Sequence, residues 1–258
     1  MLTRIHGALV TRVSPGLLGR HPRNTLFSFN YHNVRHITAF LKRSAEWLPA
    51  DGMTFLDIGA GACPYHALFA NHAARYIAID TADGLPDDDR RGIEFMRGSA
   101  ESLPLADATV DCVLFNQVLE HVADPERSLS EISRVLKPGG RLLGSVPHIS
   151  PVHLEPGDYR RYTDLGLRQL LERHQFTEIV IEGNGGVYCT AALLLTMDWM
   201  LSRRCEGQPQ EFSVNRAFWL SPLVGLVNLS AQAADALFGD KGRSPANLCL
   251  AARNPDDF

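Results

Sequence analysis

The first clear pattern of apolar positions lies between residues 31 and 48. Its apolar side chains recur every third or fourth position and share one helix face: Val34, Ile37, Leu41, Ala45 and Leu48. Pro49 ends this pattern. The period then changes at residues 53–58, where a short continuous apolar run ends in glycines. We therefore expect a helix, then a buried strand and a tight turn.

Short apolar runs and helical patterns alternate through the rest of the first two thirds of the chain. Further strands are expected at residues 75–80, 93–97, 110–115, 141–146 and 176–182, and a last one at 246–253. Asp124 and Pro125 predict the start of a helix that ends at Pro138-Gly139-Gly140. Thr163 precedes a second helical run that extends to residue 173. The alternation predicts a parallel sheet with helices on both faces.

Two long apolar segments, 187–201 and 218–238, lie between the last two expected strands. The favoured interpretation is burial in a core or in a lid, because stripes of Leu, Met and Trp are usually packing surfaces. A partner-subunit surface, a pocket for a hydrophobic acceptor and a peripheral contact with a membrane are the alternatives. Polar residues interrupt both segments, so no membrane-spanning helix is expected, and the N-terminal apolar stretches are too short for a signal peptide.

Composition narrows the class of protein. The chain has 258 residues, 45% of them hydrophobic, with a net charge of -4. This balance is typical of a globular protein and gives no broad electrostatic surface for nucleic acid. The five cysteines are scattered without CxxC spacing, and His148 and His153 do not form a diagnostic ligand pattern. We expect a cytoplasmic protein without disulfides, a metal site or a nucleic-acid partner.

The strongest chemical signal is the turn after the first buried strand. Asp57 closes the strand, and Gly59 and Gly61 lie in the turn. Glycine permits unusual backbone angles and the close approach of a ligand. About 20 residues later Asp80 ends another strand, where a carboxylate can accept hydrogen bonds from ribose hydroxyls. Each feature alone is also compatible with an ordinary turn.

Four segments in order make this signal specific: LDIGAGAC, IAID, GSAESLPLADATVDCVLFNQVLEHVADP and RVLKPGGRLL. In this arrangement the chain resembles the class I S-adenosylmethionine-dependent methyltransferases, most closely the type 11 variety. A nicotinamide-dependent dehydrogenase would share the glycine turn and the ribose acid. It would not explain the third and fourth segments, so we favour the methyltransferase family.

The resemblance implies a Rossmann-like, doubly wound α/β fold with a seven-stranded sheet whose last strand is antiparallel. It implies one domain over residues 1–258, divided into an N-terminal helical cover (1–50), a cofactor-binding core (51–182), an apolar helical insertion (183–245) and the last strand (246–253). It also implies the following contacts with S-adenosylmethionine: Asp57, Gly59 and Gly61 at the amino acid portion, Asp80 at the ribose, Ala100 and Glu101 at the adenine, and Asn116 at the methionine end. Cys63 and Ser99 depart from the family pattern, in the turn and at the adenine contact.

Residues 147–163 follow the fifth expected strand and supply candidates for acceptor binding. His148 is the preferred general base, since neutral imidazole is available near about pH 7. Tyr159 and Arg161 could orient an acceptor, Arg161 through a carboxylate or phosphate. A solvated loop with local ion pairs is the alternative. His121 is a second base candidate, although bracing of the following helix by Glu120-His121 is favoured.

The predicted function is methyl transfer from S-adenosylmethionine to a small-molecule or lipid-linked acceptor. The alternative is a non-catalytic cofactor-binding or assembly protein with the same fold. The amino-acid sequence leaves the acceptor, the methylated atom and the oligomeric state open.

Overall fold

The structure is a computed structural model that describes residues 18–81, 92–153, 157–201, 214–239 and 242–256. It divides into two compact units. The sheet unit comprises residues 39–148, 159–182 and 248–258, and the helical unit comprises residues 1–38, 149–158 and 183–247. These boundaries interleave along the chain, in contrast to the expected consecutive segments. The organisation as one functional domain stays a prediction.

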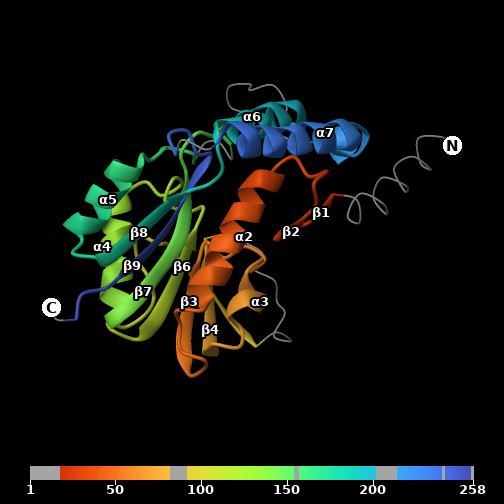
Figure 1. Ribbon diagram of the computed structural model, residues 1–258. Helices are drawn as coiled ribbons and strands as arrows, with labels where there is room; N and C mark the ends of the chain where they lie inside the picture. The colour runs from red at the N-terminus through yellow and green to blue at the C-terminus, as the bar shows by residue number, and fades with distance from the viewer. Residues whose placement is uncertain (1–17, 82–91, 154–156, 202–213, 240–241, 257–258) are drawn as a thin grey trace. The chain divides into compact units, whose positions relative to one another are not determined.

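The sheet has seven strands in the order β5-β4-β3-β6-β7-β9-β8 (Figure 1). Their bounds are Met53–Ile58 (β3), Ala73–Asp80 (β4), Ile93–Arg97 (β5), Val110–Asn116 (β6), Leu136–Pro147 (β7), Thr177–Gly183 (β8) and Asn247–Arg253 (β9). β3 pairs in parallel with β4 on one side and with β6 on the other. β4 also pairs in parallel with β5, and β6 with β7. The predicted doubly wound, seven-stranded fold is confirmed.

The central strands are apolar on both faces because helices cover both sides of such a sheet. Every residue of β3 except Thr54 is buried, and so is every residue of β6 except Asp111 and Asn116. The chain leaves β3 toward β4 on one side and returns to β6 on the other. The order of strands therefore reverses between β3 and β6, and ligands bind beside the carboxyl ends of strands at such a point.

The helices of the sheet unit begin where their caps predict. α4, Pro125–Val135, is capped by Asp124, whose Oδ1 accepts from the Arg127 N–H at 3.0 Å. α5, Asp164–Arg173, is capped by the Thr163 hydroxyl. The helix after the glycine turn, α3, is only His66–Phe69.

Pro138-Gly139-Gly140 was expected to end the helix, but α4 already ends at Val135 and these three residues lie inside β7. The end of the chain holds this segment in the sheet. Gly139 N donates to Pro255 O at 3.2 Å, and Asn254 N donates to Gly140 O at 2.8 Å. These partners are more than a hundred residues apart, so local sequence could not reveal them.

The helical unit contains the short antiparallel strands β1 (Gly19–Arg20) and β2 (Arg23–Asn24), the first half of α2 (Tyr31–Ala45), α6 (Val187–Met200) and α7 (Val214–Phe238). α6 and α7 pack against each other (Figure 1). The helices occupy the two apolar segments that the sequence singled out, within a few residues at each end.

One carboxylate of α7 caps the start of α6. The Asp235 carboxylate accepts from the backbone N–H groups of Gly186 at 3.0 Å, Tyr188 at 3.1 Å and Cys189 at 3.1 Å. Burial alone would raise the pKa of Asp235, but these hydrogen bonds outweigh it and the pKa is lowered. A Cβ at position 186 would lie 2.4 Å from Asp235 Oδ1, so only glycine fits there.

In the Asp235→Ala variant the free energy of unfolding is expected to be about 1–3 kcal/mol lower than in the natural chain. The reason is that the N–H groups at the start of α6 lose their acceptor. Urea unfolding followed by circular dichroism measures the difference. Asp198→Ala, at an exposed carboxylate of α6, is the matched control and should change stability by less than about 0.5 kcal/mol. Equal losses in the two variants would contradict the capping role.

Residues Asn215–Phe238 of α7 form a helix long and apolar enough to cross a membrane by length and composition, with 33% of the apolar window buried. A core helix of a soluble protein passes the same test, but such a helix is mostly buried. Length and composition alone do not show that this helix crosses a membrane, so the expectation of no membrane-spanning helix stays a prediction. The preferred burial of the two apolar segments does not hold for the large apolar residues of α7 that are exposed.

Candidate functional site

The glycine turn joins the carboxyl ends of β3 and β4. Gly59 N donates to Ile79 O at 2.8 Å, and Gly61 N donates to Asp80 Oδ2 at 2.9 Å. Gly59 has a φ of +66°, and a Cβ there would lie 2.4 Å from a methyl group of Val118. Gly61 has a φ of +49°, and a Cβ there would meet nothing within 4 Å. The turn is thus closed on the Gly59 side and open above Gly61, beside the Asp80 carboxylate.

Cys63 fills a position that favours glycine. Its φ is +50°, in the left-handed region, and its side chain is 2% exposed. The Cys63 N–H donates to Ala60 O at 2.8 Å and closes the turn. The backbone therefore keeps the shape that a third glycine would give, at a cost of about 1 kcal/mol for a residue with a side chain.

Asp57 lies beneath the turn as a buried acid, 4% exposed. Burial raises its pKa to about 7, the hydrogen bond from Tyr76 opposes this shift, and the charge of Asp80 adds to it. The Tyr76 hydroxyl donates to Asp57 Oδ2 at 2.9 Å. Tyr76 was not among the predicted site residues. Its position in the strand that ends at Asp80 could have indicated that it lies near the turn. A nearby cation would favour the charged carboxylate and release a proton.

The raised pKa of Asp57 predicts a pH-dependent stability. The carboxyl binds its proton more tightly in the folded chain than in the unfolded chain, where its pKa is about 3.9. Its stabilising contribution is therefore complete below about pH 4 and is lost as the pH rises through about 7. Asp57→Asn lacks this titration, so its stability relative to the natural chain should rise by about 4 kcal/mol across that range.

Urea unfolding of both proteins, without added ligand, at several pH values between about 4 and 8 measures this difference. Asp107→Asn, at an exposed carboxylate, is the control. A difference between natural chain and Asp57→Asn that is flat with pH would contradict the raised pKa.

The segment expected beside the adenine has a bracing role in this structure. Ala100 is buried, and Glu101 Oε1 accepts from Ala123 N at 2.8 Å and from Asp124 N at 3.1 Å. Arg127 Nε donates to Glu101 O at 2.7 Å. Glu101 therefore fixes the start of α4, and its contact with a cofactor stays a prediction.

Polar side chains follow the ends of β6 and β7. Ser145 Oγ donates to Asn116 Oδ1 at 2.5 Å, and Gln117 Nε2 donates to Ser145 Oγ at 2.9 Å. Gln117 has a φ of +57°, which turns the chain sharply after β6. Asn116 thus lies at the carboxyl edge, next to the glycine-turn strand β3, as expected. Gln117 and Ser145 were not among the predicted site residues.

His148 directly follows β7 at the same edge. Its Nδ1 lies 2.6 Å from Tyr162 O. Because a carbonyl oxygen only accepts, Nδ1 carries the proton, and the lone pair of the neutral ring is on Nε2. The backbone carbonyl of Tyr162 therefore fixes the tautomer of His148 in which Nε2 can accept a proton.

The other acceptor candidates lie after this histidine in the sheet unit. Tyr159 is 56% exposed, and its N–H donates to Glu120 O at 2.9 Å. Arg160 donates to Val122 O at 2.6 Å and to Ala123 O at 2.8 Å, so it braces the loop after β6. Arg161 donates to Arg160 O at 2.7 Å. Backbone hydrogen bonds and the Arg160 side chain thus anchor residues 159–161 and leave the Tyr159 ring at the surface.

Glu120 is fully buried, and its Oε1 lies 3.6 Å from His121 Nε2. Tyr159 contacts the backbone oxygen of Glu120 and not this side-chain pair, so the bracing role of Glu120-His121 stays a prediction.

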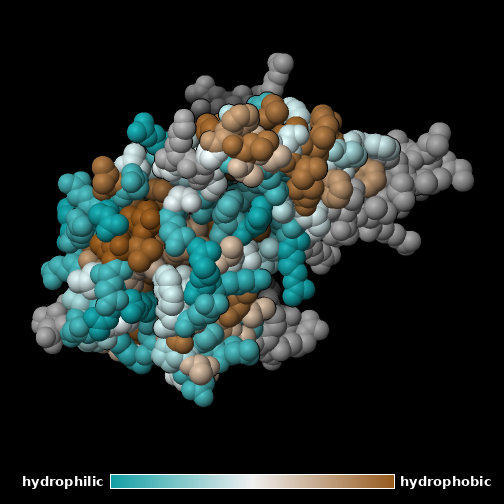
Figure 2. All heavy atoms as spheres, viewed as in Figure 1, coloured by the Kyte–Doolittle hydropathy of each residue, from teal (hydrophilic) through white to brown (hydrophobic). Residues whose placement is uncertain are grey.

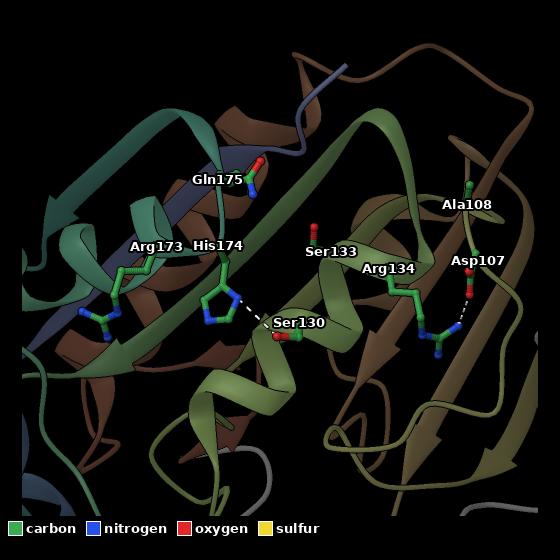
Figure 3. Close-up of a pocket in the computed structure, with 8 residues that line it drawn as sticks. All are labelled: Asp107, Ala108, Ser130, Ser133, Arg134, Arg173, His174 and Gln175. Atoms are coloured by element: carbon green, nitrogen blue, oxygen red, sulfur yellow. Dashed lines mark hydrogen bonds and ion pairs between the residues drawn. The ribbon is translucent and has the colours of Figure 1, made fainter. Parts of the chain in front are cut away.

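A separate cavity of about 460 Å³ lies elsewhere in the sheet unit (Figure 3). Its lining comes from the residues just before β6, the end of α4 and the end of α5: Asp107, Ala108, Ser130, Ser133, Arg134, Arg173, His174 and Gln175. Its charges are paired, Arg134 with Asp107 and Glu131, and Arg173 with Glu126. These segments precede strands, so the cavity lies at the edge opposite the glycine turn.

Residues 56–144 match the family model of a methyltransferase domain. A demethylmenaquinone methyltransferase of Clavibacter sepedonicus is 33% identical over 120 residues, which are 44% of this chain and 49% of that protein. The chain spans less than half the length of the curated relatives it matches.

Two solved structures share the fold at low identity. Phosphoethanolamine N-methyltransferase 2 of Haemonchus contortus, in complex with S-adenosylmethionine, is 18% identical, with a TM-score of 0.56 over 86% of this chain and 52% of that one. The [4+2]-cyclase SpnF is 21% identical, with a TM-score of 0.57 over 85% and 81%.

Proposed function

We propose that this protein transfers a methyl group from S-adenosylmethionine to a small-molecule or lipid-linked acceptor. Residues 56–144 match the model of a methyltransferase domain. The observation that carries the proposal is the glycine turn. It is open above Gly61, and the Asp80 carboxylate lies against it.

The residues at this edge suit the charges of the cofactor. Asp80 accepts from Gly61 N through Oδ2, and its carboxylate has further lone pairs for ribose hydroxyls. The buried Asp57 carboxyl would become charged beside the cationic amino acid portion of S-adenosylmethionine. Asn116 lies at the end of β6, next to β3, where the methionine end would bind. These assignments rest on the family and on this geometry together.

When bound, the cofactor supplies a methyl group on a sulfonium, which is already a strong electrophile. The protein therefore mainly aligns the acceptor and excludes water. For an acceptor that must lose a proton, His148 Nε2 takes it, with Nδ1–H held by Tyr162 O. Tyr159 offers a ring and a hydroxyl to the acceptor, and Arg161 a guanidinium for an anionic group.

The acceptor is proposed to be small or lipid-linked. A relative that matches nearly half of this chain is named for methylation of demethylmenaquinone. The exposed apolar residues of α6 and α7 favour the lipid-linked class. We propose a cytoplasmic location, because the scattered cysteines of the sequence suggest no disulfide framework. The non-catalytic alternative has less support because Asp57, Gly59, Gly61 and Asp80 are all present.

The purified protein should be incubated with methyl-labelled S-adenosylmethionine and a panel of quinones, phenols, amines and carboxylic acids, with and without lipid tails. We expect label transfer and matching release of S-adenosylhomocysteine with one acceptor class. Asp80→Ala is the control for cofactor dependence. Cofactor binding without transfer to any class would favour the non-catalytic alternative.

A further inference from the structure

Helix α7 buries two polar side chains beside Ala217, Val224 and Ala231, and it exposes its largest apolar side chains. Ser221 and Asn228 are almost fully buried, at 1% and 0% exposure. Asn228 Nδ2 donates to Leu26 O at 2.7 Å and to Ser28 O at 3.1 Å. The exposed large residues of α7 are instead apolar: Trp219, Leu223, Leu226, Leu229, Leu237 and Phe238, at 45–79% exposure.

The neighbouring helix α6 also buries polar side chains, here beside Leu193 and Met200. Thr190 and Thr196 are buried, and their hydroxyls donate to Ser244 O and Phe29 O, both at 2.7 Å. Val187, Tyr188 and Leu195 point outward at 39–52% exposure. Hydrophobic side chains gather over α6 and α7 in the space-filling view (Figure 2). We call the exposed apolar residues of the two helices the apolar face.

Charged residues lie at the borders of this face. Among the described residues of α6, α7 and 242–243, the exposed charged side chains are Arg216 near the start of α7, Arg243 after its end, and Asp198 in α6. Asp235 is committed to the α6 cap. With Asp235 counted, these charges sum to zero, and the two exposed cations lie near the start of α7 and beyond its end. Aromatic rings also lie near both ends of α7, at Trp219 and Phe238.

We propose that the apolar face inserts into the surface of a lipid bilayer that contains anionic head groups. Leu, Trp and Phe on the outer side of a helix, with cations at its ends, are typical of helices in the membrane interface. The Thr190 and Thr196 hydroxyls and the Asn228 amide nitrogen already have partners within the helical unit, so insertion does not require new partners for them. The inference deepens the proposed function, since a surface-bound enzyme can take a lipid-linked acceptor directly.

Vesicle co-sedimentation of the full chain tests this proposal. We expect binding to phosphatidylcholine vesicles that contain about one third phosphatidylglycerol. Binding to vesicles of phosphatidylcholine alone should be several-fold weaker. Leu226→Gln should lower the partition coefficient about tenfold, and Leu226→Gln with Leu229→Gln about 100-fold. Leu165→Gln, at a leucine of α5 that is 73% exposed, is the matched control and should change it less than twofold.

Absence of binding to both vesicle types would overturn the proposal. So would a dimer in sedimentation velocity that the Leu226→Gln variant abolishes, because the face would then bind a second copy of the chain. Calorimetric affinity for S-adenosylmethionine should be unchanged in the leucine variants. Vesicle binding by a protein that fails to bind the cofactor would contradict the proposed function and leave the lipid surface standing.

Discussion

The Asp80→Ala variant is expected to bind S-adenosylmethionine at least about 100-fold more weakly than the natural chain. The carboxylate makes two kinds of contact in the proposed complex. It fixes the open turn through the Gly61 N–H at 2.9 Å, and it accepts hydrogen bonds from ribose hydroxyls. Hydrogen bonds to charged groups contribute about 1.5–3 kcal/mol each, so loss of the ribose contacts alone accounts for the effect.

Asp80→Asn separates the two contacts. Its amide oxygen can still accept from Gly61 N, so the turn keeps its shape, but the charge is lost. We expect an affinity between those of the natural chain and Asp80→Ala, with unfolding by urea close to natural in both variants. Calorimetry measures the affinities. If Asp80→Ala binds S-adenosylmethionine as tightly as the natural chain, Asp80 does not hold the ribose.

The His148→Ala variant is expected to lower kcat by about 100-fold to 10,000-fold for an acceptor that loses a proton. The imidazole is held by Tyr162 O on Nδ1, which leaves Nε2 to take the proton. The side chain lies after β7, whereas the proposed cofactor contacts follow β3, β4 and β6. Affinity for S-adenosylmethionine should therefore change less than about threefold.

Steady-state kinetics with the acceptor found in the label-transfer panel measures this effect. His174→Ala, at a histidine bonded to Glu126 beside the opposite edge of the sheet, is the control and should leave kcat unchanged. Unchanged turnover in His148→Ala would remove this residue from the mechanism. An equal fall in kcat and in cofactor affinity would indicate a structural role instead.

The strands and caps were predictable because they depend on nearby residues. Continuous apolar runs identified β3 and β5 with the observed bounds, and Asp124 and Thr163 marked the two helix starts. The glycine turn was predictable for the same reason, because its angles require glycine. The beginning of β7 was not, since Asn254 and Pro255 from the end of the chain hold it in the sheet.

The environment of each site residue was less predictable than its position. Asp57 was expected to contact a ligand, but its burial against Tyr76 depends on the packing of two strands. Glu101 was expected at the adenine, yet its carboxylate caps backbone at 123–124 that lies more than twenty residues away. The exposure of the large apolar side chains of α7 was also not predictable, because composition does not show which side of a helix faces outward.

Calorimetric titration with S-adenosylmethionine and S-adenosylhomocysteine, with NAD as the control, tests the central claim most directly. We expect micromolar binding of both sulfur compounds, release of a proton as Asp57 becomes charged, and no binding of NAD. Binding of NAD, or of none of the three by protein shown to be folded, would contradict the claim that the open turn above Gly61 holds the methyl donor.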